Sequence, residues 1–565
     1  MSQLMLLKDP KTVLRTAFTS SGARGEVFTR RWVVDLVLDL AGYRAETDLG
    51  RSVIVEPACG RGAFLVPIVE RLAESCARYG RSLDGMGTAI MAFDLMEHNV
   101  QASRESVEEC LKRLGIRADV AKRLSSQWIT RRDFLLEGWN ADGRMKTDYV
   151  VGNPPYLRLE DVPADIGEAY RAQCSTMRGR ADIYIGFFER GLSLLAAEGR
   201  LAFICADRWM HNQYGRRLRA LVAAQYSMDA VVVMHRVDAF EELVSAYPAI
   251  TVLRNGSQGT AHIVEADDGF DELDGRTVAD GLVRGLHPAS VHGHFKATRL
   301  NGWFSGSGQW PSGSTRTLEL VSYLESNFAP LEDQHTGTRV GIGVATGCDD
   351  VFVVNEATGV ELCRLLPLLT ARDIVTGTPR WGGRFLVNPW ESGRLVDLEK
   401  YPGLAAYLQR HDARIRARYV ARKRPATWYR TIDRVDPDLQ GQPKLLLPDL
   451  KPASHPVLDA GGFYPHHNLY YIVSDTWDLE VLGGLLLSDF TNLLIGAYCV
   501  KMRGGTYRFQ AQYIRKVRVP LGTGIDSGSA EALASAFRRR DRVAATDAAA
   551  PLYRISISDL SATVT

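Results

Sequence analysis

The stretch Val53-Ile54-Val55-Glu56-Pro57-Ala58-Cys59-Gly60-Arg61-Gly62-Ala63-Phe64-Leu65 decides the fold of this chain. Its first three residues are apolar and β-branched and, with the preceding Ser52, predict a strand over Ser52–Val55, and its two glycines predict a tight loop. The apolar positions that follow predict a helix from Ala63 to about Ala77. A strand, a glycine loop and a helix in this order open a doubly wound α/β sheet, in which ligands bind at the carboxyl ends of the strands.

The alternation of short apolar runs and helical patterns continues to about residue 255. Further strands are predicted at Thr88–Phe93, Ser126–Thr130, Asp148–Gly152, Arg200–Cys205, Ala230–Met234 and Ala249–Leu253, the last of them antiparallel. Helices are predicted at Trp32–Ala41, His98–Leu114, Ile183–Ala196 and Tyr214–Ala224. The predicted fold class is therefore α/β, with a doubly wound, Rossmann-like domain over residues 1–255.

The rest of the chain has a different character. Residues 256–315 are rich in Gly, Ser, His and Asp, which predicts a connector with little regular core. Residues 316–522 contain short β-like runs (Val351–Val354, Lys444–Leu447, Leu469–Val473) and some helices, which indicates a second, mixed α+β domain. Residues 523–565 are rich in Ala, Arg and Ser, and we expect a peripheral tail.

Composition sets bounds on the class of protein. The 565 residues are 45% hydrophobic and 24% charged, as in globular proteins of several domains, and the net charge of +2 leaves room only for a local basic face. Eight cysteines show neither a CxxC pair nor zinc spacing, so we expect a reduced, cytoplasmic setting and no metal. We also expect no membrane segment and no signal peptide.

Acidic residues follow the first three predicted strands. The glycine loop lacks the third glycine of a dinucleotide fingerprint and begins with Glu56, whose carboxylate repels phosphate and suits a cofactor with a cationic amino-acid end. Asp94 could hold ribose hydroxyls, and Asp133-Phe134 could accept from an adenine amine and pack on its ring. Each acid alone could be a cap or turn residue, but three at successive strand ends favour a ligand site.

The tetrapeptide Asn153-Pro154-Pro155-Tyr156 follows the fourth predicted strand. Prolines donate no ladder hydrogen bond, so one interpretation is a turn that ends the strand. The other is a rigid pocket for a flat ring that carries an amine. The Asn153 oxygen and a proline-freed carbonyl can both accept from one NH2 group, while Tyr156 lies on the ring face.

These motifs together carry a family resemblance. EPACGRG (Glu56–Gly62), Asp94, Arg132–Leu135 and NPPY, in this order, resemble the gamma-order, Taq-like N6-adenine DNA methyltransferases of type II restriction–modification systems. Val27–Thr29 upstream and four segments downstream (Arg178–Tyr184, Gly199–Ile204, Val237–Phe240, Val244–Ile250) continue the resemblance. It is good from about 15 to 255 and loose from 315 to 522. Thr29-Arg30-Arg31 departs from it, because the family often has Thr-Pro-Pro there.

The resemblance implies S-adenosylmethionine as the cofactor and assigns residues to it. The cofactor-binding residues that it implies are Thr29, Glu56, Ala58, Gly60, Gly62, Asp94, Leu95, Asp133 and Phe134. The catalytic residues that it implies are Asn153, Pro154, Pro155, Tyr156 and Phe240. Tyr156 and Phe240 would lie on the two faces of a base flipped out of the duplex, although Phe240 is also readable as a core residue.

The function that follows is methyl transfer to N6 of a flipped adenine in double-stranded DNA, which would protect host DNA in a restriction–modification system. We expect a monomer, with any cognate restriction endonuclease acting separately. Cytosine N4 is an alternative target, against which Asn rather than Ser at position 153 argues. An RNA or protein-glutamine methyltransferase and a non-catalytic DNA-binding specificity subunit are further alternatives. C5-cytosine chemistry is disfavoured, because its nucleophilic Cys typically follows Pro and none does here.

Two basic stretches in the second half are candidates for DNA contact. The first runs from Arg410 to Arg424 with aromatic residues interleaved, and a solvated helix explains it equally well. The second runs from Lys501 to Gln510 and ends in Arg515–Arg518, and within it we expect Arg503, Gly504, Tyr507, Arg508 and Gln510 to contact DNA. A loose match to a PD…DxK nuclease pattern at Asp438 and Asp449–Lys451 is of a kind that arises easily by chance.

Overall fold

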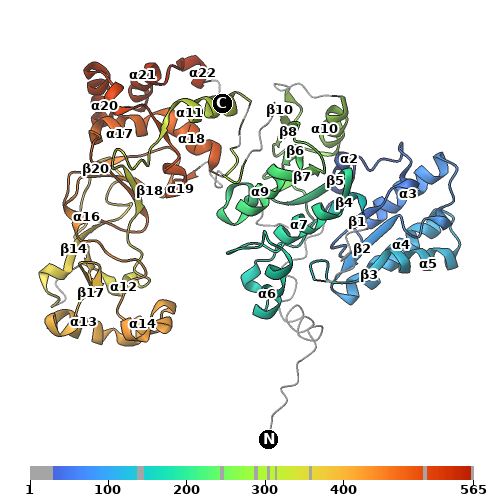
Figure 1. Ribbon diagram of the computed structural model, residues 1–565, viewed down its shortest axis with the longest axis horizontal. Helices are drawn as coiled ribbons and strands as arrows, with labels where there is room; N and C mark the ends of the chain where they lie inside the picture. The colour runs from blue at the N-terminus through green and yellow to red at the C-terminus, as the bar shows by residue number, and fades with distance from the viewer. Residues whose placement is uncertain are drawn as a thin grey trace, which may run out of the picture. The chain divides into compact units, whose positions relative to one another are not determined.

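The computed structural model describes residues 29–136, 146–241, 247–284, 291–301, 306–311, 313, 315–355, 359–499 and 506–561. The chain divides into two compact units, Met1–Trp310 and Pro311–Thr565, drawn as ribbons in Figure 1. Each unit has a hydrophobic core of its own.

Ten described strands of the N-terminal unit form one sheet. Their spatial order is β3 (Ile129–Arg131), β2 (Ile90–Asp94), β1 (Ile54–Glu56), β4 (Thr147–Gly152), β5 (Leu195–Ala206), β7 (Pro248–Arg254), β6 (Ser227–Val233), β8 (Thr260–Ala266), β10 (Phe295–Asn301) and β9 (Val291–His292). The strand expected near residue 250 is β7, which runs antiparallel to β5 and β6 as predicted.

The spatial order of the strands reverses at β1, although the strands there stay parallel. β1 pairs in parallel with β2 on one side and with β4 on the other, and β4 pairs in parallel with β5. This is the switch point of a doubly wound sheet, where strand order reverses and a crevice opens beyond the carboxyl ends. The predicted α/β, Rossmann-like fold class is confirmed.

Helices cover both faces of the central strands. The helices of this unit are α2 (Arg31–Ala41), α3 (Leu65–Arg78), α4 (Glu97–Arg113), α5 (Ala118–Trp128), α6 (Ala164–Gln173), α7 (Tyr184–Leu194), α8 (Arg208–His211), α9 (Arg216–Gln225) and α10 (Glu272–Arg284). Val37 of α2 shares a core with Val151 and Ala202. Neighbouring residues of a strand point to opposite faces of the sheet, so Leu201 points away from the face that Ala202 shares with α2. Gly191 of α7 packs on that opposite face, where a Cβ on it would lie 2.8 Å from Leu201.

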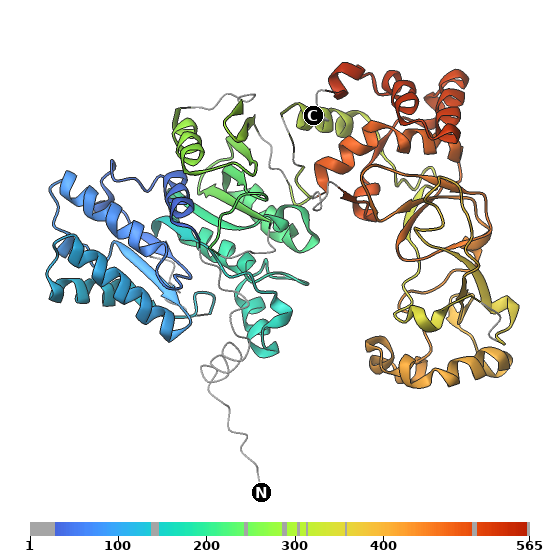
Figure 2. The same ribbon diagram turned by 180° about the vertical axis from the view of Figure 1, so that it is seen from behind.

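The structure corrects two sequence predictions here. Residues 260–301 are not a connector, because β8 and β10 extend the sheet and α10 packs on α2. Figures 1 and 2 show these three elements together at one end of the sheet. The apolar run of β8, which includes the buried Ile263 and Val264, is short and flanked by Gly and Ser, so the sequence did not predict a strand there. The strand expected at Ser126–Thr130 is shorter, because its first half ends α5.

The C-terminal unit is mixed α+β, as predicted. Its larger sheets have the orders β12 (Arg339–Ile342), β22 (Leu469–Val473), β18 (Lys444–Pro448), β20 (Val457–Asp459) and β13 (Val353–Val354), β15 (Phe385–Val387), β14 (Leu365–Leu369), β21 (Tyr464–Pro465). Short ladders join β11 (Ala329–Pro330) to β24 (Arg518–Val519), β16 (Trp390–Glu391) to β17 (Arg394–Leu395), and β19 (Leu450–Lys451) to β23 (Tyr507–Arg508).

The helices of the C-terminal unit are α11 (Thr315–Asn327), α12 (Asp349–Phe352), α13 (Pro402–Arg410), α14 (Asp412–Arg416), α15 (Tyr419–Lys423), α16 (Asp438–Gly441), α17 (Leu479–Leu487), α18 (Asp489–Tyr498), α19 (Ala511–Ile514), α20 (Ser527–Arg539), α21 (Arg542–Tyr553) and α22 (Ile557–Ser561). The strand expected at Val351–Val354 is therefore half helical, because its first residues end α12.

The expected peripheral tail is part of this core. α20 and α21 pack on α17, and Leu533, Phe537 and Tyr553 are buried. The approach is close, since a Cβ on Gly484 would lie 2.5 Å from the Leu533 carbonyl oxygen. The many small residues of this segment favoured the prediction of an exposed tail. Small residues also let helices pack closely together.

No single helix among the described residues is long and apolar enough to cross a membrane. Only α17 and α18 taken together, across a 61° bend, reach the length and composition of a span. Most of their apolar side chains are buried in the core of the C-terminal unit. The eight cysteines are free thiols.

A buried ion pair in the C-terminal unit gives a first prediction. Lys444 Nζ lies 2.9 Å from Asp459 Oδ2 and donates to the carbonyl oxygens of Gln440 and Gln442, and both charged side chains are almost fully buried. Lys444→Met leaves the Asp459 charge buried and unpaired, so we expect a loss of about 3–5 kcal/mol in the free energy of unfolding. Denaturant unfolding of the full chain measures this loss. The double variant Lys444→Met/Asp459→Leu should recover much of it, and a double variant less stable than Lys444→Met would contradict this interpretation.

Candidate active site

The residues singled out in the sequence converge at the carboxyl ends of β1, β2 and β4. Glu56 ends β1, Asp94 ends β2, and Asn153 directly follows β4. The contact between the first and last of these strand ends is close, because a Cβ on Gly152 would lie 3.7 Å from Glu56 Cγ. Parallel pairing therefore brings together side chains that lie nearly one hundred residues apart in sequence.

The glycine loop takes a backbone conformation that its glycines permit. Gly60 and Gly62 have φ of +52° and +93°, a region that side chains with a Cβ disfavour. The Gly60 backbone N–H donates to Asp94 Oδ2 at 3.0 Å, and Oδ1 of the same carboxylate accepts from the backbone N–H of Met96 at 2.8 Å. Asp94 thus ties the ends of β1 and β2 together. Ala58 and Leu95 are half-buried beside this loop.

Glu56 is the most unusual group of the site. Its side chain is 2% exposed, and Oε2 has no hydrogen-bond partner among the described residues. Burial, and next the nearby Asp94 carboxylate, raise the pKa of Glu56 well above its ordinary value. A buried carboxylate of this kind favours a cation that removes the cost of its charge.

Asp133 and Phe134 lie after β3 in a tight turn. Asp133 Oδ1 accepts from the backbone N–H of Leu135 at 2.9 Å, and Oδ2 accepts from the Tyr170 hydroxyl at 2.9 Å. The Phe134 ring is 2% exposed and stacks on Phe187 with centroids 5.4 Å apart. These interactions are with the protein's own loop and core.

Asn153 joins the N-terminal segment and the segment after β6. Its Nδ2 donates to Thr29 Oγ1 at 3.2 Å, and Thr29 forms an antiparallel bridge with Phe240. The following Arg30 donates its backbone N–H to the Ala239 carbonyl oxygen at 3.1 Å. Three segments that are distant in sequence therefore meet at the amide of Asn153.

Two aromatic rings lie at the same place. Tyr156 and Phe240 contact each other edge to face, with centroids 6.3 Å apart and an interplanar angle of 82°. Tyr156 is partly exposed, and its hydroxyl donates to the Ile204 carbonyl oxygen at 3.4 Å. Pro154 is buried and Pro155 is half-buried between Asn153 and this pair.

The residues expected to contact DNA are only partly described. Arg503 and Gly504 lie outside the described residues. Arg508 is exposed and pairs with Asp449 at 3.2 Å, Tyr507 lies in the short strand β23, and Gln510 precedes α19 and accepts from Gln512. The second basic stretch is thus anchored in part to its own unit.

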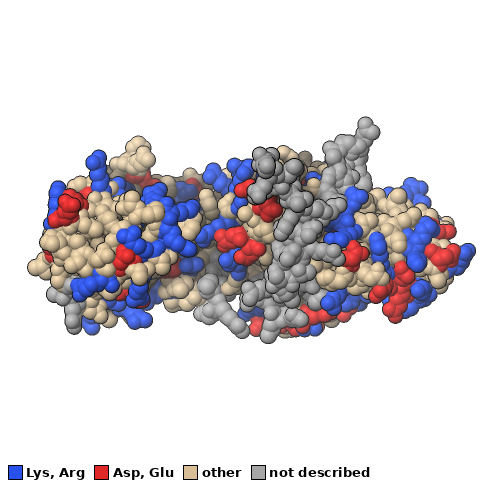
Figure 3. Space-filling model, turned by 90° about the horizontal axis from the view of Figure 1, so that it is seen from below, with Lys and Arg blue, Asp and Glu red and all other residues tan. Residues whose placement is uncertain are grey.

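The first basic stretch forms α14, α15 and their flanks. Arg418 is internal, since its guanidinium donates to the carbonyl oxygens of Thr346 and Arg430 at 2.8 Å, and burial lowers its pKa. Arg422, Lys423 and Arg424 are exposed, and these three form no ion pair with any described residue. Figure 3 shows many Lys and Arg side chains on the face of the C-terminal unit seen from below.

Sequence reasoning missed a polar cluster at the ends of β5 and β6. Asp207 follows β5, is 3% exposed, and its Oδ2 lies 2.7 Å from Nε2 of His235, which follows β6. The His235 ring packs on Tyr247, directly before β7. The pair ties the segment that leads to Phe240 to the sheet. The sequence does carry a signal for it, because Asp207 is a fourth acid at a strand end.

The sheet topology and the side chains gathered at the β1–β4 switch point define a class of Rossmann-like proteins that bind a ligand at this strand end, here with a second, mixed α+β unit. A family model described as "Eco57I restriction-modification methylase" matches residues 78–240. The chain is 43% identical to the Type II methyltransferase M.PaeR7I of Pseudomonas aeruginosa over 545 residues, which cover 96% of this chain and 93% of the relative. It is 40% identical to the Type II methyltransferase M.XhoI of Xanthomonas vasicola, over 96% of this chain and 99% of the relative. The chain belongs to the type II methyltransferases of restriction–modification systems.

Solved structures agree with the fold at low sequence identity. The Type IIL restriction-modification enzyme MmeI, solved in complex with DNA, aligns with a TM-score of 0.57 at 13% identity, over 98% of this chain and 73% of that chain. The Type ISP enzyme LlaGI, as a nuclease-deletion mutant with a DNA substrate mimic, aligns with a TM-score of 0.53 at 11% identity, over 94% of this chain and 56% of that chain. Likeness of this kind extends to both units and concerns the fold alone.

The burial of Glu56 generates a prediction on stability. Because its pKa in the folded state is raised, the protonated carboxyl stabilises the fold below the unfolded pKa of 4.5, and this stability is lost as pH rises through the folded pKa. Glu56→Gln removes that titration. We expect the variant to gain free energy of unfolding over the wild type by about 1.4 kcal/mol per pH unit across this window.

Denaturant unfolding of both proteins between weakly acidic and neutral pH checks this. The control is Glu74→Gln, whose side chain is 61% exposed on α3. A difference between Glu56→Gln and the wild type that does not change with pH would contradict the prediction.

Proposed function

We propose that this methyltransferase transfers a methyl group from S-adenosylmethionine to N6 of an adenine flipped out of double-stranded DNA. The observation that carries the proposal is the position of Asn153-Pro154-Pro155-Tyr156. The tetrapeptide lies at the end of β4 against the buried Glu56 carboxylate, and its Tyr156 contacts Phe240.

The residues at β1 and β2 fit S-adenosylmethionine. The Oε2 atom of Glu56, which has no partner among the described residues, is a buried hydrogen-bond acceptor that becomes negatively charged beside a cationic amino-acid end. The glycine loop lets the backbone approach a ligand closely. Asp94 is half-buried at the end of β2, where ribose hydroxyls would be held. When bound, the cofactor supplies an electrophilic methyl group on a positively charged sulfur.

Asn153 and Pro154 would act on the amine of the target base. An exocyclic adenine amine is a weak nucleophile, because its lone pair is delocalised into the ring. The amine donates one hydrogen to Asn153 Oδ1 and the other to the Pro154 carbonyl oxygen, which favours a tetrahedral nitrogen with an available lone pair. Donation from Asn153 Nδ2 to Thr29 orients the amide so that its oxygen faces away from Thr29. Positioning and oriented dipoles supply the acceleration.

Tyr156 and Phe240 would bind the two faces of the flipped base. They contact each other edge to face, so a base enters between them only if the rings separate or turn. Stacking on aromatic rings contributes roughly 1–3 kcal/mol per base, comparable to the cost of unstacking the base from the duplex.

Cytosine N4 is the second candidate target, since the same geometry accepts any exocyclic amine on a flat ring. Asn at position 153, rather than Ser, favours adenine. A non-catalytic specificity subunit is a candidate of another class, against which the complete set of Glu56, Asp94, Asp133 and NPPY argues.

We predict that Asn153→Ala and Tyr156→Ala each abolish methyl transfer, because they remove an acceptor for the amine and a stacking face. Cofactor binding should persist in both, since neither residue belongs to the glycine loop. Incorporation of label from S-adenosylmethionine into duplex DNA, followed by digestion to nucleosides, measures transfer and identifies the product, and calorimetry measures cofactor binding.

The expected product is N6-methyl-2′-deoxyadenosine. N4-methyldeoxycytidine would assign the alternative target, and DNA binding without any labelled nucleoside would assign the specificity subunit. Asn327→Ala on α11 is the matched control and should leave transfer unchanged. Full activity in either site variant would refute the assignment.

We further propose that the protein acts as a monomer. Its C-terminal unit would recognise the DNA site through the second basic stretch. Arg503 and Arg508 would bind phosphate or purine edges, Gly504 would allow close approach, and Tyr507 and Gln510 would complete the interface. The exposed Arg422–Arg424 run supports a second DNA-binding region.

Charge reversal of Arg503 and Arg508 should weaken DNA binding. The dependence of log affinity on log salt should become shallower by about 0.9 for each phosphate that the variant no longer neutralises. Titrations of labelled duplex at several salt concentrations measure both quantities. Arg539→Glu on α20 is the matched surface control. If binding weakens only after reversal of Arg422 and Arg424, the DNA-binding region is the first stretch instead.

A further inference from the structure

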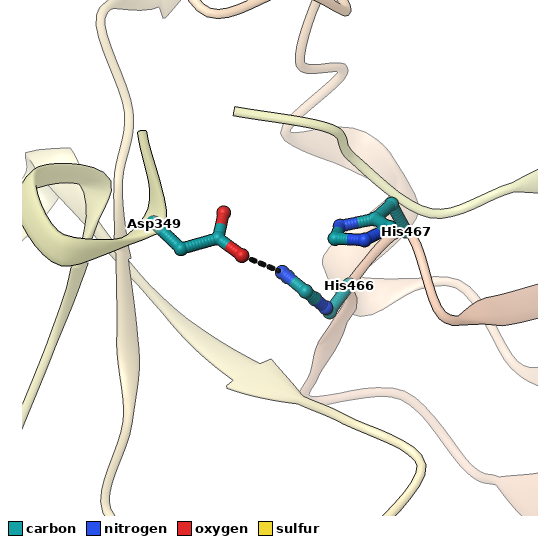
Figure 4. A group of neighbouring side chains, drawn as sticks. All are labelled: Asp349, His466 and His467. Carbon is teal, nitrogen blue, oxygen red and sulfur yellow. Dashed lines mark hydrogen bonds and ion pairs between the residues drawn. The ribbon is translucent and has the colours of Figure 1, made fainter. Parts of the chain in front are cut away.

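Three side chains of the C-terminal unit meet outside the region that resembles the catalytic site. Asp349 Oδ2 lies 3.0 Å from His466 Nε2, and a ring nitrogen of His467 lies within 4.8 Å of both. Figure 4 shows the Asp349 carboxylate facing His466, with the His467 ring beside it. The two imidazole rings have centroids only 4.1 Å apart. Asp349 and His466 are separated by 117 residues, so sequence spacing gave no indication of the cluster.

Hydrogen bonds to the side chain of Asp349 and from the backbone of both histidines hold the three residues in place. Asp349 begins α12, and its Oδ1 accepts from the Thr346 hydroxyl at 2.5 Å. His466 donates its backbone N–H to the Leu369 carbonyl oxygen at 2.9 Å, and His467 donates to that of Val344 at 3.0 Å. The loop between β21 and β22 is therefore fixed against the segment that leads into α12.

The chemistry of the cluster favours a cation. The two imidazole rings each offer a nitrogen donor beside one carboxylate oxygen, and the three ligand atoms lie within 4.8 Å of one another. One carboxylate beside two imidazoles gives the donor set a single negative charge. An Asp–His hydrogen bond alone accounts for two of the three residues and leaves the adjacent His467 ring without a role.

We propose that Asp349, His466 and His467 bind a divalent transition-metal ion of the zinc type. Nitrogen and carboxylate donors lie about 2.0–2.2 Å from Zn²⁺ in tetrahedral sites, which places ligand atoms about 3.3–3.6 Å from one another. Asp349 Oδ2 and His466 Nε2 lie 3.0 Å apart and all three ligand atoms lie within 4.8 Å of one another, so small side-chain rotations complete the site. Imidazole and carboxylate together suit Zn²⁺, Co²⁺ and Ni²⁺.

The ion joins two loops of the C-terminal unit and leaves positions open to solvent. His466 is buried, whereas the Asp349 side chain is 46% exposed and His467 is also exposed. Water therefore completes the coordination at the surface. Binding to the folded state alone stabilises it, so the metal raises the unfolding temperature of the unit.

The test uses untagged, chelator-treated full-length protein with Cys363→Ser, which removes an exposed thiol that binds metal adventitiously. Co²⁺ is titrated and followed by its visible absorption, and Zn²⁺ is then added in competition. We expect saturable binding of one Co²⁺, displacement by Zn²⁺ and a higher unfolding temperature. His467→Ala and Asp349→Asn, both at accessible positions, should each weaken binding at least tenfold.

The matched control is His335→Ala, an exposed histidine of the same unit outside the cluster, which should bind as the parent does. Circular dichroism confirms that each variant is folded. Absence of saturable Co²⁺ binding to the parent would overturn the proposal, as would equal affinity of the parent and His467→Ala. Because the readout is metal binding, it is independent of methyl transfer.

Discussion

The parallel pairing of β1 with both β2 and β4 is the constraint on which the candidate site depends. Glu56, Asp94 and Asn153 belong to separate strand–helix units, and only the register of these strands brings them to one edge. Parallel strands need long crossovers, so the helices α3, α4 and α5 fill the connections and cover the sheet. The site is therefore a consequence of the winding of the sheet rather than of any one loop.

A second level of organisation holds the Asn153 amide. Thr29, from before the sheet, and Phe240, from after β6, form a bridge with each other while Thr29 accepts from Asn153. The Asp207–His235 pair ties the segment before Phe240 to β5. Chain segments over two hundred residues apart thus fix the environment of a tetrapeptide that is itself rigid because of its prolines.

Local motifs were predictable from the sequence, and distant pairings were not. The glycine loop, the NPPY motif and the strands around them follow from periodicity and backbone chemistry over a few residues. The bridge between Thr29 and Phe240 and the meeting of Asp349 with His466 depend on tertiary folding across long separations. Composition misled at 256–315 and 523–565, because Gly, Ser and Ala are equally compatible with exposed segments and with close packing, as the buried Ala534 and Ala536 of α20 show.

Two buried ionisable side chains in this chain have opposite surroundings, and the contrast bears on function. Lys444 is almost completely buried, yet it has Asp459 and two carbonyl oxygens as partners. Glu56 is equally buried, faces a second carboxylate at Asp94, and has one oxygen without a partner among the described residues. The fold thus supplies partners for a buried charge where stability alone is concerned. Glu56 lacks such partners, and it lies at the strand end where ligands bind in folds of this kind. A buried group that destabilises the unliganded fold at this place indicates that a ligand binds it.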